Sequence, residues 1–557
     1  MSDSGMVSRI YNRFRGADFR GDEISLVRSP DCLNVWRDYS EIESIRTRPG
    51  MKLNTPFDSS VYGVFFFNNM MLVHSGDKLY SVQSGEKMEI YSGLNERASN
   101  AFIYNNVWYF QDGKNYLQHD GEKTSSVVGY VPTTSIAKSP EGSGTIYEDV
   151  NLLSAGRINT FLADGRSKEY HLDTFNLDVS FRPIVKVNDK PVDEFTVDYE
   201  KGIITFEKTP PVPLTDGRDN VTVEFRKTVP GYAERIQRCT LLQVFDNRVF
   251  FSGNPDYPNT VWHCSLNDPT YFSDLDYYNE GLDTAAVKGL VAGNNALWVF
   301  REPSQANTTV FYHTPTLDAD YGKIYPSQHS SVTTGCVGKA VNFNDDIVFF
   351  SERGMEGISG DITTEQVVAH RSSLVDRKLT AEGGYKDMIL EEWEGYLLVI
   401  IGDKIFLADS RTAFELEGRK EYEWFYWSMG REITCARVQD GVLYLGASDG
   451  VYTLTDHTSD VESHWVTPKD KFKYPNMQKT TNKRGCLAEA TGDVTVYVKT
   501  DKTDFELVEE YSGVTDHFTC RIKRKKFKDI QLKFESKTRF SLESVTLECF
   551  VGGYIKR

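Results

Sequence analysis

The chain has 557 residues, of which 39% are hydrophobic and 26% charged, an ordinary globular composition with room for several domains. Its net charge of −17 argues against general nucleic-acid binding, because attraction to phosphate requires excess positive charge. The 13% share of aromatic residues and the 42 glycines favour β structure, since aromatic side chains fit pleated surfaces and glycine fits turns.

We expect neither a membrane-targeting or membrane-spanning segment nor disulfide cross-links. The first five residues lack the apolar core of a signal peptide. The longest apolar stretch, near residues 397–401, is far shorter than the roughly 20 residues that span a bilayer. The eight cysteines are scattered without a CxxC pair, so we expect free, partly buried thiols and neither a zinc site nor a disulfide framework.

Residues 1–55 form the first predicted segment. This stretch is polar, rich in arginine and short of core residues. We expect an extended N-terminal arm that packs on the following domain or on a neighbouring subunit.

A repeated unit begins after residue 55 and consists of a polar turn, an apolar strand, a Gly/Asp turn and another strand. Successive copies are 37 to 51 residues apart, apart from one interval of 141, and each is marked by a turn residue: Asn69, Asn106, Asn247, Asn295, Asp346, Gly395 and Gly441. Roughly 40–50 residues is the length of a four-stranded propeller blade. We therefore predict an all-β protein with a β-propeller of six or seven blades, over residues 56–146 and 231–460. A pair of stacked β-sandwiches is the rival architecture.

The interval of 141 residues contains a different pattern, over residues 147–230. Short strands at about 184–187, 195–199, 203–206 and 220–226 are separated by polar turns. We predict an inserted β-sandwich on a loop between two blades, because exposed turns tolerate added domains.

Residues 461–557 are predicted to form a C-terminal β-sandwich of five strands. Residues 463–557 carry a balance of +6, whereas residues 1–462 carry −23. The concentrated basic stretch 521–528 (RIKRKKFK) has three interpretations. It is an edge strand protected by lysine, a docking site for an acidic partner, or a nucleic-acid contact, and the two-sided charge with few aromatic residues disfavours the last.

Motifs of known enzyme chemistry give no support for an enzyme. There is no HExxH, HxH or GxxxxGK[ST] pattern, and the one GxSxG match, GASDG at 446–450, lies in a predicted strand-turn-strand unit rather than before a helix. His119 and His263 follow predicted strands at turns, where hydrogen-bonded structural roles are expected. Propeller glycosidases are the main enzymatic rival, and the single SDGVY turn at 448–452 is a weak match to sialidase-type blades. We predict no catalytic, cofactor-binding or metal-binding residues and no cofactor, and thus no enzyme.

Several phrases resemble the packaged-DNA stabilisation and tail-nozzle proteins of short-tailed bacteriophages. These are residues 14–19 (FRGADF), 28–35 (RSPDCLNV) and 46–50 (RTRPG), followed by 247–254, 268–272 and the inserted module near 187–206. The resemblance implies a homohexameric ring beneath the portal and adaptor that extends the DNA channel and retains the packaged genome until ejection. Its implied partners are copies of itself, portal and adaptor proteins, tail fibre or needle proteins, and viral DNA passing without sequence-specific binding.

This resemblance places the protein in the tail of the virion after assembly in the host cytoplasm. An acidic lumen would repel DNA phosphates and ease passage. Two alternatives stay open: a carbohydrate-binding or depolymerising propeller at the tail tip, and a cellular scaffold propeller.

Overall fold

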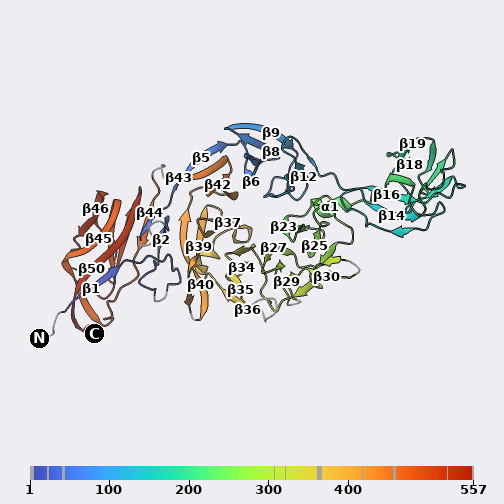
Figure 1. The fold of residues 1–557 in the computed structure, drawn as a ribbon. Coiled ribbons are helices and arrows are strands. Elements are labelled where there is room, and N and C mark those ends of the chain that lie inside the picture. Colours follow the sequence, from blue (N-terminus) through green and yellow to red (C-terminus); the bar gives the residue numbers. More distant parts are fainter. Residues whose placement is uncertain are drawn as a thin grey trace. The chain divides into compact units, whose positions relative to one another are not determined.

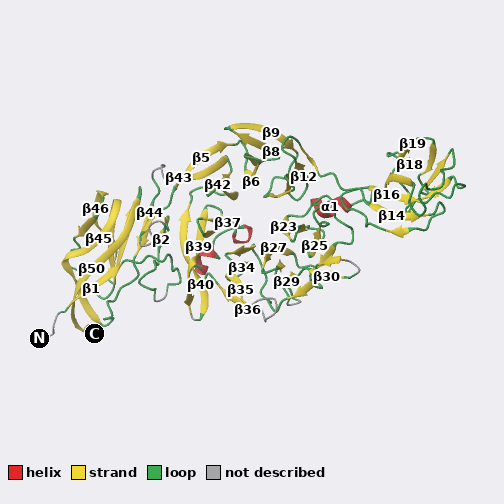
Figure 2. Ribbon diagram, in the orientation of Figure 1, coloured by secondary structure: helices red, strands yellow, loops and turns green. Residues whose placement is uncertain are grey.

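The computed structural model describes residues 5–21, 24–39, 44–305, 308–319, 322–359, 367–416, 418–455, 460–523 and 525–554. The elements are almost entirely β-strands (Figure 1 and Figure 2). The chain divides into two compact units. Unit 1 comprises residues 1–76, 80–87 and 331–557, and unit 2 comprises residues 77–79 and 88–330.

Seven four-stranded antiparallel sheets form the main part of the described chain. Unit 2 contains the sheets β10(Asn100–Tyr104)-β11(Val107–Gln111)-β12(Tyr116–His119)-β13(Thr124–Ser126), β23(Leu241–Phe245)-β24(Arg248–Ser252)-β25(Thr260–His263)-β26(Tyr277–Asn279) and β27(Val287–Gly293)-β28(Ala296–Arg301)-β29(Val310–His313)-β32(Ser327–His329). Unit 1 contains β33(Ala340–Phe343)-β34(Asp346–Ser351)-β35(Gly354–Ser359)-β36(Val367–His370), β37(Ile389–Trp393)-β38(Tyr396–Ile401)-β39(Lys404–Leu416)-β40(Arg419–Ser428) and β41(Cys435–Gln439)-β42(Val442–Ala447)-β43(Gly450–Thr455)-β5(Gly50–Pro56). The strands of the seventh sheet, β6(Val61–Phe67)-β7(Met70–Ser75)-β8(Lys78–Gln83)-β9(Glu86–Ser92), are divided between the units. These sheets are the blades of a β-propeller, and the predicted fold class is confirmed.

The same kind of turn joins the first two strands of every blade. The first two strands of each sheet are joined by two residues with positive φ, for example Asn105 (47°) and Asn106 (59°), or Asn294 (52°) and Asn295 (58°). Two consecutive positive φ angles define the type I′ turn, whose twist matches that of the flanking strands and which Asn, Asp and Gly tolerate best. The other five turns use Asn68-Asn69, Asp246-Asn247, Asn344-Asp345, Glu394-Gly395 and Asp440-Gly441. The repeat seen in the sequence is therefore a repeat of turn chemistry.

Strand β5 completes the last blade from the beginning of the chain. Its residues 50–56 pair antiparallel with β43, so that Gly450 lies opposite Pro56 and Thr455 opposite Gly50. The predicted arm extended to residue 55, but its final residues are a propeller strand. Sequence patterning did not show this, because the partner strand lies some 400 residues further along.

The inserted domain has two sheets. One has six strands in the order β15(Thr145–Ile146)-β14(Thr133–Lys138)-β16(Gly156–Phe161)-β22(Val221–Arg226)-β18(Ile184–Val187)-β19(Lys190–Val192). The other has three, in the order β17(Glu169–His171)-β21(Ile203–Phe206)-β20(Phe195–Asp198). A shared core that includes Phe161, Tyr170, Phe206 and Val223 joins them. Its first strand, β14, begins at Thr133, ahead of the predicted boundary at 147.

The C-terminal domain, predicted as a β-sandwich of five strands, is one eleven-stranded sheet, because four strands of the N-terminal arm join it. The main path runs β2(Cys32–Leu33)-β44(Ser463–Val466)-β49(Ile530–Ser536)-β45(Met477–Thr500)-β50(Phe540–Tyr554)-β4(Ile45–Thr47)-β3(Val35–Trp36). β1(Met6–Tyr11) pairs with β50, and β46(Thr503–Val514), β47(His517–Cys520) and β48(Lys526–Phe527) pair with β45. Because the path starts and ends on strands separated only by Asn34, the sheet curls into a nearly closed barrel.

Helical structure is confined to short pieces in the described part of the chain. These are α1(Tyr232–Gln237), α2(Asp376–Leu379) and a 3₁₀ turn at Tyr385–Asp387, and a small two-stranded sheet, β30(Thr316–Asp318)-β31(Gly322–Ile324), accompanies them. None of the described helices is long and apolar enough to cross a bilayer.

Candidate functional site

The N-terminal arm forms a joint within unit 1 between β40 and the C-terminal sheet. The sequence predicts a polar segment short of core residues, but several of its apolar residues are buried: Tyr11, Phe14, Ala17, Cys32, Val35, Trp36 and Ile45. β1 pairs with β50 over six residues. At the end of β1 the Arg9 Nε and the Tyr11 hydroxyl donate to the Asp470 carboxylate at 2.6 and 2.8 Å. The arm is an integral part of the core.

The first phrase of the phage-protein resemblance, residues 14–19, lies at the centre of this joint. The Phe14 ring meets Trp465 edge-on, with centroids 5.4 Å apart. The Ala17 amide donates to the Trp424 carbonyl oxygen at 2.6 Å. Gly16 has φ +96°, and a Cβ there would lie 2.1 Å from that same oxygen. Only glycine fits this close approach.

The other two N-terminal phrases contact the same two elements. In residues 28–35, the Ser29 hydroxyl donates to the Val466 carbonyl at 2.7 Å. In residues 46–50, the Arg48 guanidinium donates to the carbonyls of Ser428 and Pro49 and to Asn34 Oδ1, at 2.8 to 3.0 Å. Burial lowers the pKa of Arg48 to about 10. All three phrases thus lie where the N-terminal arm contacts β40 and the C-terminal sheet.

Three arginines of the N-terminal arm surround a buried carboxylate on β40. Glu423 is fully buried, and its Oε1 lies 3.3 Å from Arg15 and 3.6 Å from Arg28, while Arg37 lies 3.9 Å from Oε2. Burial raises the pKa of Glu423 to about 7, although the three arginines act to lower it. Such a pKa suits a general acid, but a side chain with no exposed surface cannot reach a substrate. The network instead neutralises charges that the joint buries.

A second cluster, which is partly exposed, surrounds His370 on β36. Its Nδ1 lies 3.1 Å from Glu356 and its Nε2 lies 2.5 Å from Asp376. Burial alone would lower the pKa of His370, but the two carboxylates outweigh it and raise the pKa to about 10. The nearby Ser372 hydroxyl donates to Asp376 rather than to the imidazole. An imidazolium held by two acids cannot accept a proton from serine at neutral pH, so this cluster is not a Ser-His-Asp triad.

The histidines singled out from the sequence have structural surroundings. His119 Nδ1 lies 3.0 Å from the Thr124 hydroxyl, and His263 Nδ1 lies 3.1 Å from the Cys264 carbonyl. Burial lowers the pKa of His263 to about 4. Both residues are hydrogen bonded inside blades, as expected.

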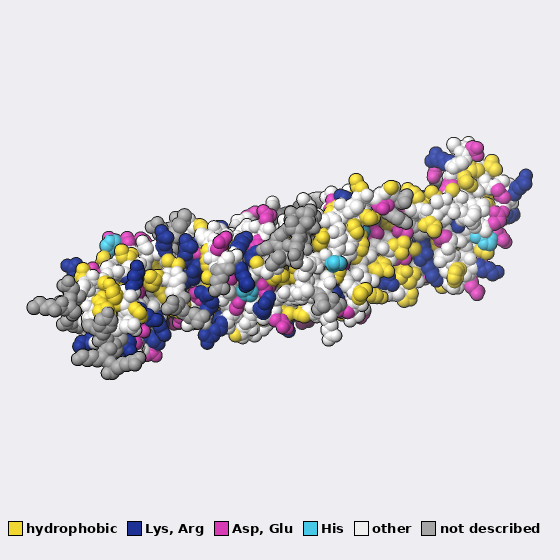
Figure 3. All heavy atoms as spheres, turned by 90° about the horizontal axis from the view of Figure 1, so that it is seen from below, with side chains coloured by type: hydrophobic (Ala, Val, Ile, Leu, Met, Phe, Trp, Pro, Cys, Tyr) yellow, Lys and Arg dark blue, Asp and Glu magenta, His cyan; other side chains and the backbone are white. Residues whose placement is uncertain are grey.

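The basic stretch 521–528 is largely irregular. Only Lys526–Phe527 forms a strand, β48, on β45, while Arg524 lies outside the described residues. Ile522 and Phe527 are buried, whereas Arg521 and Lys523 are exposed. On the face drawn in Figure 3, basic and acidic side chains are interspersed. A regular strand with charges on both faces, which the sequence suggested, is therefore not formed.

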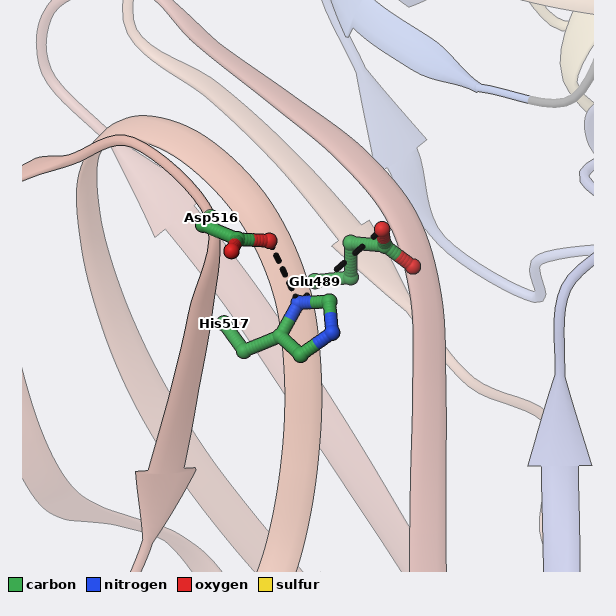
Figure 4. Close-up of side chains that lie close together, drawn as sticks. All are labelled: Glu489, Asp516 and His517. Atoms are coloured by element: carbon green, nitrogen blue, oxygen red, sulfur yellow. Dashed lines mark ion pairs between the residues drawn. The ribbon is translucent and has the colours of Figure 1, made fainter.

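One exposed cluster could hold a divalent ion. Glu489 and His517 lie directly opposite each other on β45 and β47, and Asp516 precedes His517 (Figure 4). His517 Nδ1 lies 2.7 Å from Asp516 and 3.9 Å from Glu489, and the three groups offer ligand atoms within 4.8 Å of one another. One imidazole nitrogen and two carboxylate oxygens suit a transition metal. All three groups lie at the surface, and the contacts of His517 with the two carboxylates account for the geometry without an ion.

Comparisons with known proteins found distant structural similarity alone. No family model and no curated protein matches the chain. Solved structures of β-propeller proteins are similar at low identity. BamB from Moraxella catarrhalis is 12% identical, with a TM-score of 0.34, over 74% of this chain and 98% of its own. Streptogramin B lyase is 13% identical, with a TM-score of 0.25, over 73% and 97%. At these values the likeness carries no argument about function.

Proposed function

We propose that this chain is a structural virion protein, a subunit of a ring-shaped tail nozzle or hub. In this role it extends the DNA channel below the portal–adaptor complex, retains packaged DNA and lets it pass on ejection. Its partners are other copies of itself, about six in a ring, the adaptor and portal, and tail fibre or needle proteins. It assembles in the host cytoplasm and functions in the tail of the virion.

The position of the resemblance phrases supports the proposal most directly. Residues 14–19, 28–35 and 46–50 all lie in the joint that fixes the C-terminal sheet to β40. These residues make main-chain hydrogen bonds, ring contacts and buried ion pairs, so the phrases that resemble the phage proteins lie at the connection between two parts of unit 1.

Charge and exposed apolar surface are consistent with this role. The balance of −23 over residues 1–462 would disfavour adhesion of DNA to a channel wall. The inserted domain exposes Ile146 (83%), Val179 (78%) and Leu214 (90%). Single exposed apolar side chains are common on protein surfaces, so these three are positions at which contact with another subunit can be tested.

The decisive experiment combines virion analysis with assembly. Mass spectrometry of purified virions should detect the chain, and cryo-EM of the tail should place about six copies around an axial channel. Since assembly can require a template, mass photometry is carried out with and without the purified portal–adaptor complex. Absence from virions together with a monomer in both samples would refute the proposal.

The tail-tip alternative makes a different prediction. A carbohydrate-binding propeller should retain host polysaccharides on a glycan array. One hollow of about 410 Å³ beside α2 is lined by Glu352, Glu382 and Asp387, and its aromatic residue, Tyr385, is only 8% exposed. It therefore offers little ring surface for stacking on a sugar. Saturable glycan binding, without incorporation into a ring, would favour the alternative.

A further inference from the structure

Two cysteines lie opposite each other in the C-terminal sheet. Cys486 on β45 is the register partner of Cys520 on β47, and both side chains are buried. Directly opposed residues of an antiparallel pair have Cα atoms about 4.5 or 5.5 Å apart. Disulfides form across about 4.4–6.8 Å, so the backbone is already within reach of a bond.

The two thiols are chemically unequal. The Tyr511 hydroxyl donates to Glu509 at 2.6 Å and contacts the Thr519 carbonyl at 3.1 Å, next to Cys520. The polar neighbours Cys486 and Tyr511 lower the pKa of Cys520, although burial opposes them. The neighbouring Cys520 sulfur, together with burial, raises the pKa of Cys486. Because the thiolate is the nucleophile, Cys520 is the thiol that attacks first.

The surrounding strand offers a route to the buried pair. β47 has four residues whose side chains alternate between exposed and buried, and within the described residues it pairs only with β45. Short edge strands open locally far more often than the whole domain unfolds. A small reagent could reach Cys520 during such openings.

Neighbouring cysteines lack this arrangement. Cys549 on β50 is buried in the same sheet, but its register partners are Val7 and Thr481. Cys32 lies opposite Trp465. Cys549 is therefore a matched control that shares the domain and the burial but has no opposing thiol.

We propose that Cys486 and Cys520 are a modification site, a dithiol that low-molecular-weight disulfides convert into a cross-strand disulfide. The Cys520 thiolate attacks one sulfur of the small disulfide, forming a mixed disulfide and releasing one small thiolate. Cys486 then loses its proton and attacks the Cys520 sulfur, which releases the second small thiolate. The two protons of the cysteines end on the two released thiolates. The protein dithiol is oxidised by two electrons and the small disulfide is reduced to two thiols.

The test uses the full chain and oxidised glutathione. After native incubation and alkylation of the remaining thiols, peptide mapping without reduction should find the peptides of Cys486 and Cys520 joined, with the intact protein two hydrogen atoms lighter. Thiols titrated in denaturant should fall from eight to six. Eight persistent thiols, or a bond that joins other cysteines, would overturn the proposal. This readout requires no variant and so does not depend on a variant folding.

Variants test the order of attack. Cys486→Ser should stop at a stable glutathione adduct on Cys520, because no second thiol resolves it. Cys520→Ser should gain less adduct on Cys486 than Cys486→Ser gains on Cys520 in the same time, and Cys549→Ser should form the bond as the unmodified chain does. An adduct on Cys486 in Cys520→Ser that equals the adduct on Cys520 in Cys486→Ser would refute the assignment of the nucleophile.

Discussion

Replacing Gly16 by alanine tests the joint between the N-terminal arm and β40. At φ +96° a residue with a side chain costs about 1–2 kcal/mol. The new Cβ would also lie 2.1 Å from the Trp424 carbonyl oxygen, a backbone atom that cannot swing away as a side chain could. The arm must therefore move.

Movement of the arm removes two further contributions. The hydrogen bond from the Ala17 amide to Trp424 contributes about 1 kcal/mol. Partial exposure of the Phe14 ring against Trp465 costs about 1–2 kcal/mol more. We expect Gly16→Ala to lower the free energy of unfolding by about 3–5 kcal/mol, measured by urea unfolding followed by tryptophan fluorescence.

Alanine substitutions at two other glycines separate the cost of the positive φ from the cost of the close contact. Gly430 has φ +67° with open space around the position of a Cβ, so Gly430→Ala carries the conformational cost alone, about 1 kcal/mol. Gly383 has neither a positive φ nor a neighbour within 4 Å, and Gly383→Ala should change little. Equal losses in Gly16→Ala and Gly430→Ala would refute the reasoning that close packing makes the joint.

Three more predictions concern pH, the blade turns and the inserted domain. Because burial raises the pKa of Glu423 to about 7, the folded protein holds this proton more tightly than the unfolded chain. The stability that Glu423 contributes should be complete below about pH 4.5 and fall by up to about 3 kcal/mol as the pH rises to 7. Urea unfolding across this range should lose most of that slope in Glu423→Gln, and an unchanged slope would contradict the assignment. Asn295, at φ +58° in a type I′ turn, should tolerate Gly, whereas Val should cost about 1–2 kcal/mol and lower the thermal unfolding midpoint by about 1–2 °C. Equal midpoints for the two variants would count against the turn. Leu214→Asp, at a side chain that is 90% exposed, should weaken ring assembly in mass photometry without changing the unfolding midpoint, while unimpaired assembly would remove Leu214 from the interface.

The sequence by itself determined the blades, because blade formation depends on local chemistry. Turn residues such as Asn106 and Asn295 tolerate positive φ, and the short apolar strands beside them pair as hairpins. The inserted domain was visible for the same reason, as an interruption of that period.

Only the tertiary structure decided what the arm and the cysteines do. Arg28, Arg37 and Arg48 suggest a polar surface until a buried Glu423 or buried carbonyl groups from β40 are placed beside them. Cys486 and Cys520 are 34 positions apart and become partners through the register of β47 on β45. Pairing between distant segments depends on the complementarity of whole surfaces, and no short pattern in one strand specifies its partner.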